Sequence, residues 1–217
     1  MEDSNKGWPS CIMLAVNLIS PVSLSSVFDS GDLKDSGFEF DSHITILYSH
    51  DYLDKDYVMS DIQDIQELKD REFNINTFLE SQRKSDPKPV TDLFGLSNFS
   101  NDSDYIILRL KPGSGIYDVL SIINSALSKK YGVESDFGTY KPHLTLAELK
   151  KGTSEKYLNS ETLKAILRDS LVKFEDIIFS YDLDDKNYKV YDLTQFQSVP
   201  RYFRIYNEKE LYKELNK

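Results

Sequence analysis

Two short stretches of this sequence carry residue types that could do chemistry together. They read His43-Ile44-Thr45-Ile46 and His143-Leu144-Thr145-Leu146, so both have the order His, aliphatic, Thr, aliphatic. In a β-strand the side chains alternate between the two faces, so each His shares a face with its Thr. A single such strand would more often be an ordinary half-buried polar pair. The chain has only three histidines, however, and two of them occur in this frame, which favours a shared functional cleft.

Two His and Thr pairs facing one cleft suit acid–base chemistry at a phosphodiester. One imidazole can accept a proton from an attacking hydroxyl or water while the other protonates the leaving oxygen, because a histidine pKa of about 6.5 populates both states at neutral pH. Threonine hydroxyls can donate hydrogen bonds to the non-bridging oxygens and stabilise the charge that develops there. The predicted catalytic residues are His43, Thr45, His143 and Thr145.

The elements that must position these residues occur twice in the same order. An apolar run over 11–19, bounded by prolines, predicts a buried strand, a helix is predicted to start at Pro21, and 38–48 reads as the strand with His43. In the second half 105–110 predicts a strand, 116–131 a helix ended by Gly132, and 137–149 the strand with His143. This repetition indicates a diverged internal duplication of strand, helix and His-bearing strand.

The remaining segments complete one predicted domain over 1–217. The first lobe motif is 11–49, the second is 105–149, and the more polar 50–104 is predicted to be a mobile insert near the cleft. The insert contains apolar residues at helical spacing within 56–73, and 91–99 reads as a strand with Gly95 inside it. In the C-terminal part, 150–217, Ser160 is expected to cap a helix through Leu171, a hairpin is expected from 174–181 and 188–193, and the tail after Arg201 is expected to end in a short helix.

Charge narrows the partners that fit this chain. With 36 acidic against 26 basic residues the formal net charge is −10, which argues against wrapping a long duplex or RNA, because such binding depends on Lys and Arg neutralising phosphates. A small anionic ligand remains possible. Beside the second motif, over 139–157, four lysines (Lys141, Lys150, Lys151 and Lys156) outnumber two glutamates, which indicates either local attraction of an anion or scattered surface charge.

The single cysteine, Cys11, cannot form a disulfide within the chain and is expected to be a small core residue. The apolar run around it is too short and wrongly flanked for a signal peptide or a membrane span. We therefore expect a cytoplasmic protein with no membrane partner. No His and Cys spacing fits zinc, and the Asp-rich turn at 184–187 lacks a calcium-loop pattern, so no metal or cofactor is predicted.

The two motifs resemble those of the 2H phosphoesterases, a superfamily defined by two His-x-Thr/Ser-x motifs. The resemblance covers roughly 12–193; its most specific piece is Tyr140-Lys-Pro-His-Leu-Thr-Leu146, and Ser42-His-Ile-Thr-Ile-Leu47 is the partner. It implies a two-lobed α+β fold, with antiparallel sheets around a central cleft and helices outside. It also implies two catalytic histidines with two threonines on the phosphate. The histidines lie 100 residues apart, which is long for the family and leaves the substrate open.

The superfamily includes LigT-like RNA-end enzymes, 2′,5′-phosphodiesterases and phage anti-CBASS phosphodiesterases that cleave cyclic oligonucleotide signals. Together with the acidic charge, the resemblance implies a metal-independent phosphodiesterase for a small cyclic nucleotide or short oligonucleotide, encoded by a virus or phage as an antagonist of nucleotide-based immunity and acting in the host cytoplasm. Three alternatives stay open: RNA-end processing at 2′,3′-cyclic or 2′-5′ linkages, nucleotide binding without turnover, and an interaction protein in which the two strands are relics.

Substrate-binding residues are predicted from their position near the two motifs. Tyr48, Phe99 and Tyr140 are candidates for stacking on a base, although aromatic residues of this kind are more often core residues, and Lys141 supplies a cation beside His143. His50 has no Thr two residues on and is followed by Asp51, so we expect a surface turn there.

Overall fold

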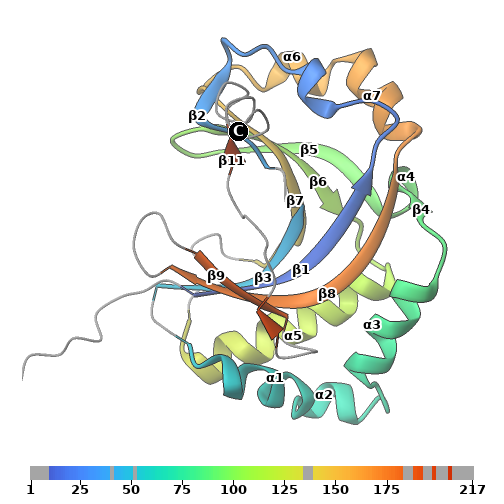
Figure 1. Cartoon of the computed structure of the whole chain (residues 1–217), viewed down its shortest axis with the longest axis vertical. Helices are drawn as coiled ribbons and strands as arrows, with labels where there is room; N and C mark the ends of the chain where they lie inside the picture. The colour runs from blue at the N-terminus through green and yellow to red at the C-terminus, as the bar shows by residue number, and fades with distance from the viewer. Residues whose placement is uncertain are drawn as a thin grey trace, which may run out of the picture.

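The computed structural model of this chain describes residues 10–39, 42–50, 53–133, 139–182, 188–192, 197–198 and 205–206. These residues form an α+β fold in which one antiparallel sheet curls into a half-barrel (Figure 1). Helices gather at the two ends of the curl, with α1, α2, α3 and α5 at one end and α6 and α7 at the other. The α+β class expected from the sequence is confirmed.

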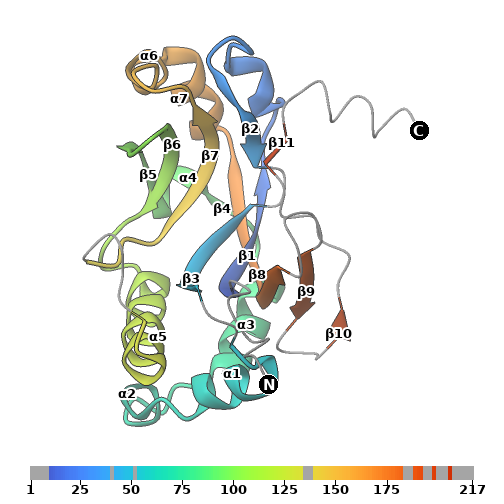
Figure 2. The same ribbon diagram turned by 90° about the vertical axis from the view of Figure 1, so that its left-hand side faces the viewer.

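Six long antiparallel strands lie side by side in the sheet. In spatial order they are β8 (Leu171–Asp182), β1 (Ser10–Ile19), β3 (His43–Ser49), β7 (His143–Leu149), β6 (Asp104–Leu110) and β5 (Phe94–Ser100). The other strands are β2 (Leu33–Glu39), which also pairs with β7, and β4 (Lys88–Pro89), β9 (Tyr188–Asp192), β10 (Gln197–Ser198) and β11 (Ile205–Tyr206). Figure 2 shows β5 and β6 on one side of the molecule and β9 and β10 on the other.

The helices differ in how their ends are capped, and in two of them, α5 and α7, a serine side chain caps the first turn. They are η1, a 3₁₀ turn (Leu24–Val27), α1 (Lys55–Gln63), α2 (Gln66–Lys69), α3 (Ile75–Lys84), α4 (Val90–Leu93), α5 (Gly115–Tyr131), α6 (Glu155–Leu158) and α7 (Glu161–Arg168). The side chain of Ser114 caps α5 and that of Ser160 caps α7, each accepting a backbone N–H three residues on. Gly132 ends α5 with φ of 66°, a left-handed conformation that only glycine adopts without strain.

The two faces of the sheet have different environments. Ile12 and Leu14 of β1 and Ile44 of β3 are fully buried in the main core, to which α1, α2, α3, α5 and α7 all contribute. The alternate residues of β1, Met13 and Ala15, belong instead to a small separate cluster with Ile178. Because side chains alternate along a strand, the helices cover one face and the His and Thr side chains lie on the other. We call this second face the His/Thr face.

The pairing pattern repeats on either side of the contact between β3 and β7. On one side β1 pairs with β3 and on the other β6 pairs with β7, and both ladders shift register by one residue. The shift leaves Ile46 unpaired on β3 and Leu146 unpaired on β7, in each case the residue directly after the motif threonine. A β-bulge therefore occurs at matching positions of the two motif strands. The amide of Asn124 in α5 donates to the Ile46 carbonyl at 2.7 Å, which satisfies this bulge.

Several elements differ from the sequence-based expectation. The helix expected after Pro21 is the four-residue turn η1, and the helix expected over 56–73 is divided into α1 and α2. Helix α3 and strand β2 were not predicted. The hairpin of β8 and β9 is confirmed, whereas the short helix expected at the end of the tail lies outside the described residues.

The segment between the two halves is built into the domain. Val58 and Ile62 of α1, Leu68 of α2 and Leu79 of α3 are all buried in the main core. Strand β5, which follows them, extends the sheet beyond β6. The described part of 50–104 therefore supplies helices to the core face, and it also supplies strand β5, which lies beside β6 at the edge of the sheet. No helix among the described residues is long and apolar enough to cross a bilayer.

Candidate active site

The two motif strands are direct neighbours in the sheet. Ile44 of β3 pairs with Leu144 of β7 in an antiparallel arrangement. The neighbouring residues follow this register. His43, which precedes Ile44, faces Thr145, and Thr45, which follows Ile44, faces His143. The structure thus brings all four predicted catalytic residues together on the His/Thr face, where each is partly exposed.

This register sets the spacing of the two imidazoles. His43 and His143 are diagonal neighbours on adjacent strands, a relation that separates Cα atoms by about 7–8 Å. A phosphate group between two imidazoles at that separation can be approached from opposite sides. The two threonines occupy the other diagonal, so their hydroxyls can reach the same group. The arrangement can therefore supply a proton acceptor, a proton donor and two neutral hydrogen-bond donors to one anion.

The ring of His143 is oriented by the backbone before β7. Its Nδ1 atom lies 2.8 Å from the carbonyl oxygen of Lys141. A carbonyl can only accept, so Nδ1 carries the proton, and in the neutral ring the Nε2 atom keeps its lone pair. The backbone thus fixes both the tautomer and the direction of this imidazole. The side chain of Lys141, predicted to contact substrate, is exposed to solvent.

Tyr140 connects the two motifs by a contact that the sequence analysis did not anticipate. Its hydroxyl donates to the carbonyl oxygen of Thr45 at 2.9 Å, and its ring packs against the main core. Burial raises the pKa of Tyr140 well above its usual range, so the hydroxyl stays protonated and remains a donor. The position predicted to stack on a base therefore ties the segment before β7 to β3 and supports the geometry of the site.

Aromatic side chains line one side of the His/Thr face. The rings of Phe99 and His143 meet edge to face with centroids 5.3 Å apart, and Phe99 also stacks on Tyr105 at 4.4 Å. The Tyr105 hydroxyl donates to Glu148 at 2.9 Å; burial, and then this bond, raises its pKa. The predicted location of Phe99 beside the catalytic residues is thus supported by a ring contact, and Tyr105 is an aromatic neighbour that the sequence analysis passed over.

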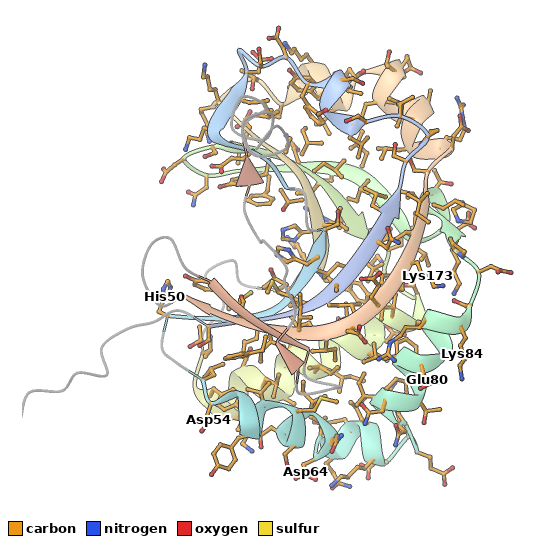
Figure 3. All side chains as sticks on the ribbon, viewed as in Figure 1. His50, Asp54, Asp64, Glu80, Lys84 and Lys173 are labelled. Carbon is orange, nitrogen blue, oxygen red and sulfur yellow. The ribbon has the colours of Figure 1, made fainter. Side chains whose placement is uncertain are left out.

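Tyr48 and His50 lie towards the outer end of β3. Tyr48 pairs with Cys11 of β1 and is 46% exposed, so it is available at the rim of the His/Thr face. The exposed ring of His50 contacts Tyr48 edge to face at 5.1 Å. Figure 3 places His50 at the edge of the molecule, in agreement with its prediction as a surface residue.

Arg109 is a residue of this face that the sequence analysis missed. It pairs with His143 across β6 and β7, and therefore points to the same side of the sheet. Its Nε atom is buried without a hydrogen-bond partner. One sequence signal was available. Arg109 is a cation inside the apolar strand Tyr105–Leu110, and the alternation of side chains places it on the same face as Tyr105.

A pocket of about 370 Å³ adjoins the site on the His43 side. Thr145 and Ser42, the residue before His43, contribute to its wall, and the loop after β1 provides most of the rest. The lining residues are Leu18, Ser20, Pro21, Val22, Ser23, Leu24, Ser25, Ser42, Thr145 and Leu146. The wall therefore mixes hydroxyls with aliphatic groups, and its lining includes no charged side chain.

Three of the lysines near the second motif make hydrogen bonds or ion pairs with neighbouring loops. Lys150 donates to the Gly31 carbonyl, Lys151 donates to Ser100 and to the backbone, and Lys156 pairs with Asp32. These contacts hold the turn between β7 and α6 against neighbouring loops. Of the two interpretations left open by the sequence, these local contacts favour scattered surface charge over an anion site for these three lysines. Arg109, in contrast, is a cation placed next to a motif histidine.

Comparison of the chain with protein-family models, with curated proteins and with solved structures gave no match. Within the described residues, no group of three or more His, Cys, Asp or Glu side chains is arranged to hold a metal ion.

Proposed function

We propose that this protein is a phosphodiesterase of the 2H type, with His43 and His143 as acid and base. The observation that carries the proposal is the register of β3 and β7. Pairing of Ile44 with Leu144 puts both histidines and both threonines on one face around a single point. Unrelated polar strands would have no reason to share this register, the same bulge position and the same order of residues.

The two histidines account for the proton transfers of the proposed reaction, and the two threonines for stabilisation of the charge. One neutral imidazole removes a proton from the attacking water or ribose hydroxyl as its oxygen bonds to phosphorus. The opposite imidazolium gives its proton to the oxygen that leaves as the second phosphorus–oxygen bond breaks. Thr45 and Thr145 donate to the non-bridging oxygens, where negative charge increases. After turnover the two histidines have exchanged protonation states and return to the starting ones through solvent.

A small nucleotide suits the site better than a long polynucleotide. The net charge of −10 disfavours extended phosphate binding, and the three lysines of 150–156 are engaged in local contacts. Phe99 and the 370 Å³ pocket provide an aromatic and a mixed surface of the size that a nucleoside needs. We propose a small cyclic nucleotide or short oligonucleotide signal as substrate, and, from the resemblance, a viral or phage protein that removes such a signal in the host cytoplasm.

The proposal is tested by incubating the purified protein in excess EDTA with cyclic di- and trinucleotides, 2′-5′ and 3′-5′ dinucleotides, and a tRNA-length RNA. Cleavage of a small nucleotide that disappears in His43→Ala and in His143→Ala supports it. RNA processed at least as efficiently as every small nucleotide, with a rate that falls steeply with salt, would favour RNA-end processing instead. Binding without turnover would indicate a protein that sequesters a nucleotide. Absence of both binding and turnover would indicate an interaction protein.

A further inference from the structure

The two halves of the candidate site differ at one matched position. In the ladder of β1 and β3 the residue opposite His43 is Ala15, whereas in the ladder of β6 and β7 the residue opposite His143 is Arg109. On each strand this residue lies two positions from the residue that pairs with the motif threonine, so Ala15 and Arg109 occupy corresponding positions in the two ladders. The twofold pattern of histidines and threonines is therefore flanked by a methyl group on one side and a guanidinium on the other.

Arg109 is placed to bind an anion beside the catalytic residues. It lies between His143 on β7 and Gly95 on β5 in one row across the sheet, and Gly95 leaves open space, because a Cβ there would have no contact within 4 Å. The buried Nε of Arg109 has no hydrogen-bond partner. Burying part of a guanidinium without satisfying it is unfavourable, and a phosphate would provide the missing acceptor in the fork geometry that arginine prefers.

The side of the site that adjoins the pocket is uncharged. The pocket at Ser42 and Thr145 includes no charged residue in its lining, and several of its serine hydroxyls are already engaged in the loop, since Ser23 and Ser25 share a hydrogen bond of 2.6 Å and Ser20 donates to the Val22 carbonyl. A second phosphate would be desolvated there without a cation. An uncharged ribose and base would instead find aliphatic contacts and hydroxyls.

We propose that the site binds its substrate in one direction, with a phosphate other than the scissile one against Arg109 and an uncharged nucleoside in the pocket at Ser42 and Thr145. This inference rests on the proposed phosphodiesterase function and specifies its substrate as one that carries at least two phosphates. The scissile phosphate already has four partners in the two histidines and two threonines. Arg109 lies beyond His143 in the sheet, where the next phosphate of the substrate would be.

The test compares dinucleotides of the cleaved linkage with and without a terminal phosphate, placed at the 5′ end in one ligand and at the 3′ end in another. Both kcat/KM and the equilibrium Kd are measured. The wild-type protein is expected to prefer one phosphorylated ligand by about 10- to 100-fold, the range for a hydrogen-bonded charge pair. Arg109→Gln should reduce this preference towards unity, because the phosphorylated ligand loses more kcat/KM and more affinity than the unphosphorylated one. Arg109→Lys should retain part of the preference.

Arg71→Ala is the matched control, because it removes an exposed arginine from the turn after α2 and should leave the preference unchanged. If Arg109→Gln lowered kcat/KM equally for the phosphorylated and the unphosphorylated ligand, the inference would be overturned, but the proposed phosphodiesterase function would not. A wild-type protein without preference would overturn it too. If the wild type cleaves nothing, the proposed function fails, and the Kd ratio alone decides whether Arg109 reads a second phosphate. Failure to bind any ligand overturns both.

The pocket is tested by a neighbouring pair of substitutions in η1. Ser25 lines the pocket, whereas Ser26 is exposed and does not. The hydroxyl of each makes a hydrogen bond to Ser23. Ser25→Phe should raise KM for the preferred dinucleotide about 10-fold or more by filling the pocket, and Ser26→Phe should leave it near the wild-type value. Equal effects of the two would show that the pocket holds no part of the substrate.

Discussion

The Nδ1 atom of His143 donates a hydrogen bond to the carbonyl oxygen of Lys141, 2.8 Å away. This bond uses a backbone group two residues before the histidine, so it forms within the motif itself and needs no other side chain. Because the bond fixes the proton on Nδ1, the opposite ring nitrogen is the one presented to the His/Thr face, as a base when neutral and as an acid when protonated. A motif histidine held in this way can serve either half of the reaction.

Removing either imidazole should abolish turnover. His43→Ala and His143→Ala should each lower kcat by about 10² to 10⁴-fold, because acid and base both act on the reaction path. Both side chains lie on the face that the helices do not cover, so the melting temperature should change little. Rates are measured on the best small nucleotide and folding by circular dichroism. Near wild-type activity in His43→Ala would refute the assignment.

The threonines should contribute less than the histidines. Thr45→Ala and Thr145→Ala each remove one donor to the charge that develops on the non-bridging oxygens, which is worth on the order of 10²-fold. Thr45→Ser and Thr145→Ser keep the hydroxyl and should retain most of the activity. Serine variants as slow as the alanine variants would show that the hydroxyls do not act as donors.

The reaction should have a bell-shaped pH dependence and be insensitive to EDTA. One histidine must be neutral and the other protonated, so the rate falls when both are protonated at low pH and when both are neutral at high pH. Steady-state rates from pH 5 to 9 (about the range over which histidines titrate) provide the profile. Loss of activity on chelation, with recovery on added Mn²⁺ or Zn²⁺, would contradict a mechanism that uses side chains alone.

Tyr140 should position β3 relative to the segment before β7. Tyr140→Phe removes the hydrogen bond to the Thr45 carbonyl and should cost about 1 kcal/mol of stability, together with a several-fold decrease in kcat. Tyr131→Phe is the matched control, since its hydroxyl bonds to Asp61 away from the site. That change should lower the melting temperature without lowering kcat. Equal kcat values in the two variants would limit Tyr140 to a structural role.

The sequence was informative where a local pattern decides the structure. Alternation over the two motifs was sufficient to predict that His43 and Thr45 share one face. Gly132 ends α5 and Ser160 caps α7, as predicted. The four catalytic candidates could therefore be found from the sequence, and the β3–β7 register then placed them together. The α+β class follows from the same patterns.

What sequence reasoning missed depends on contacts between distant segments. Arg109 becomes part of the site only through its cross-strand pairing with His143, and the hydroxyl of Tyr140 finds its partner 95 residues earlier in the chain. The sequence could not decide between an anion site and scattered surface charge for the lysines after β7, because it does not show that loops at Gly31, Asn101 and Asp32 lie within their reach. Burial of α1 and α3 in the main core likewise required knowledge of where the chain returns.

Asp104 should make stability depend on pH through contacts that hold the turn after β7. The residue is only 3% exposed. Burial alone would raise the pKa of this carboxyl, but hydrogen bonds from the Ser100 hydroxyl and from the backbone N–H groups of Ser154 and Gly152 outweigh it and lower the pKa from 3.8 to about 2. A carboxyl with a lower pKa in the folded state stabilises fully above about pH 4, and this contribution is lost as the pH falls towards 2.

Asp104→Asn should therefore destabilise the protein by about 1–2 kcal/mol at pH 7, and the difference from the wild type should shrink as the pH decreases from 4 towards 2. Asp102→Asn, at an exposed neighbouring position, is the control and should have little effect at either pH. Chemical unfolding at pH 7 and at intervals from pH 4 to 2 measures both. A difference between Asp104→Asn and wild type that is the same at every pH would mean that the substitution acts through packing, because the charge of Asp104 would then contribute nothing to folding.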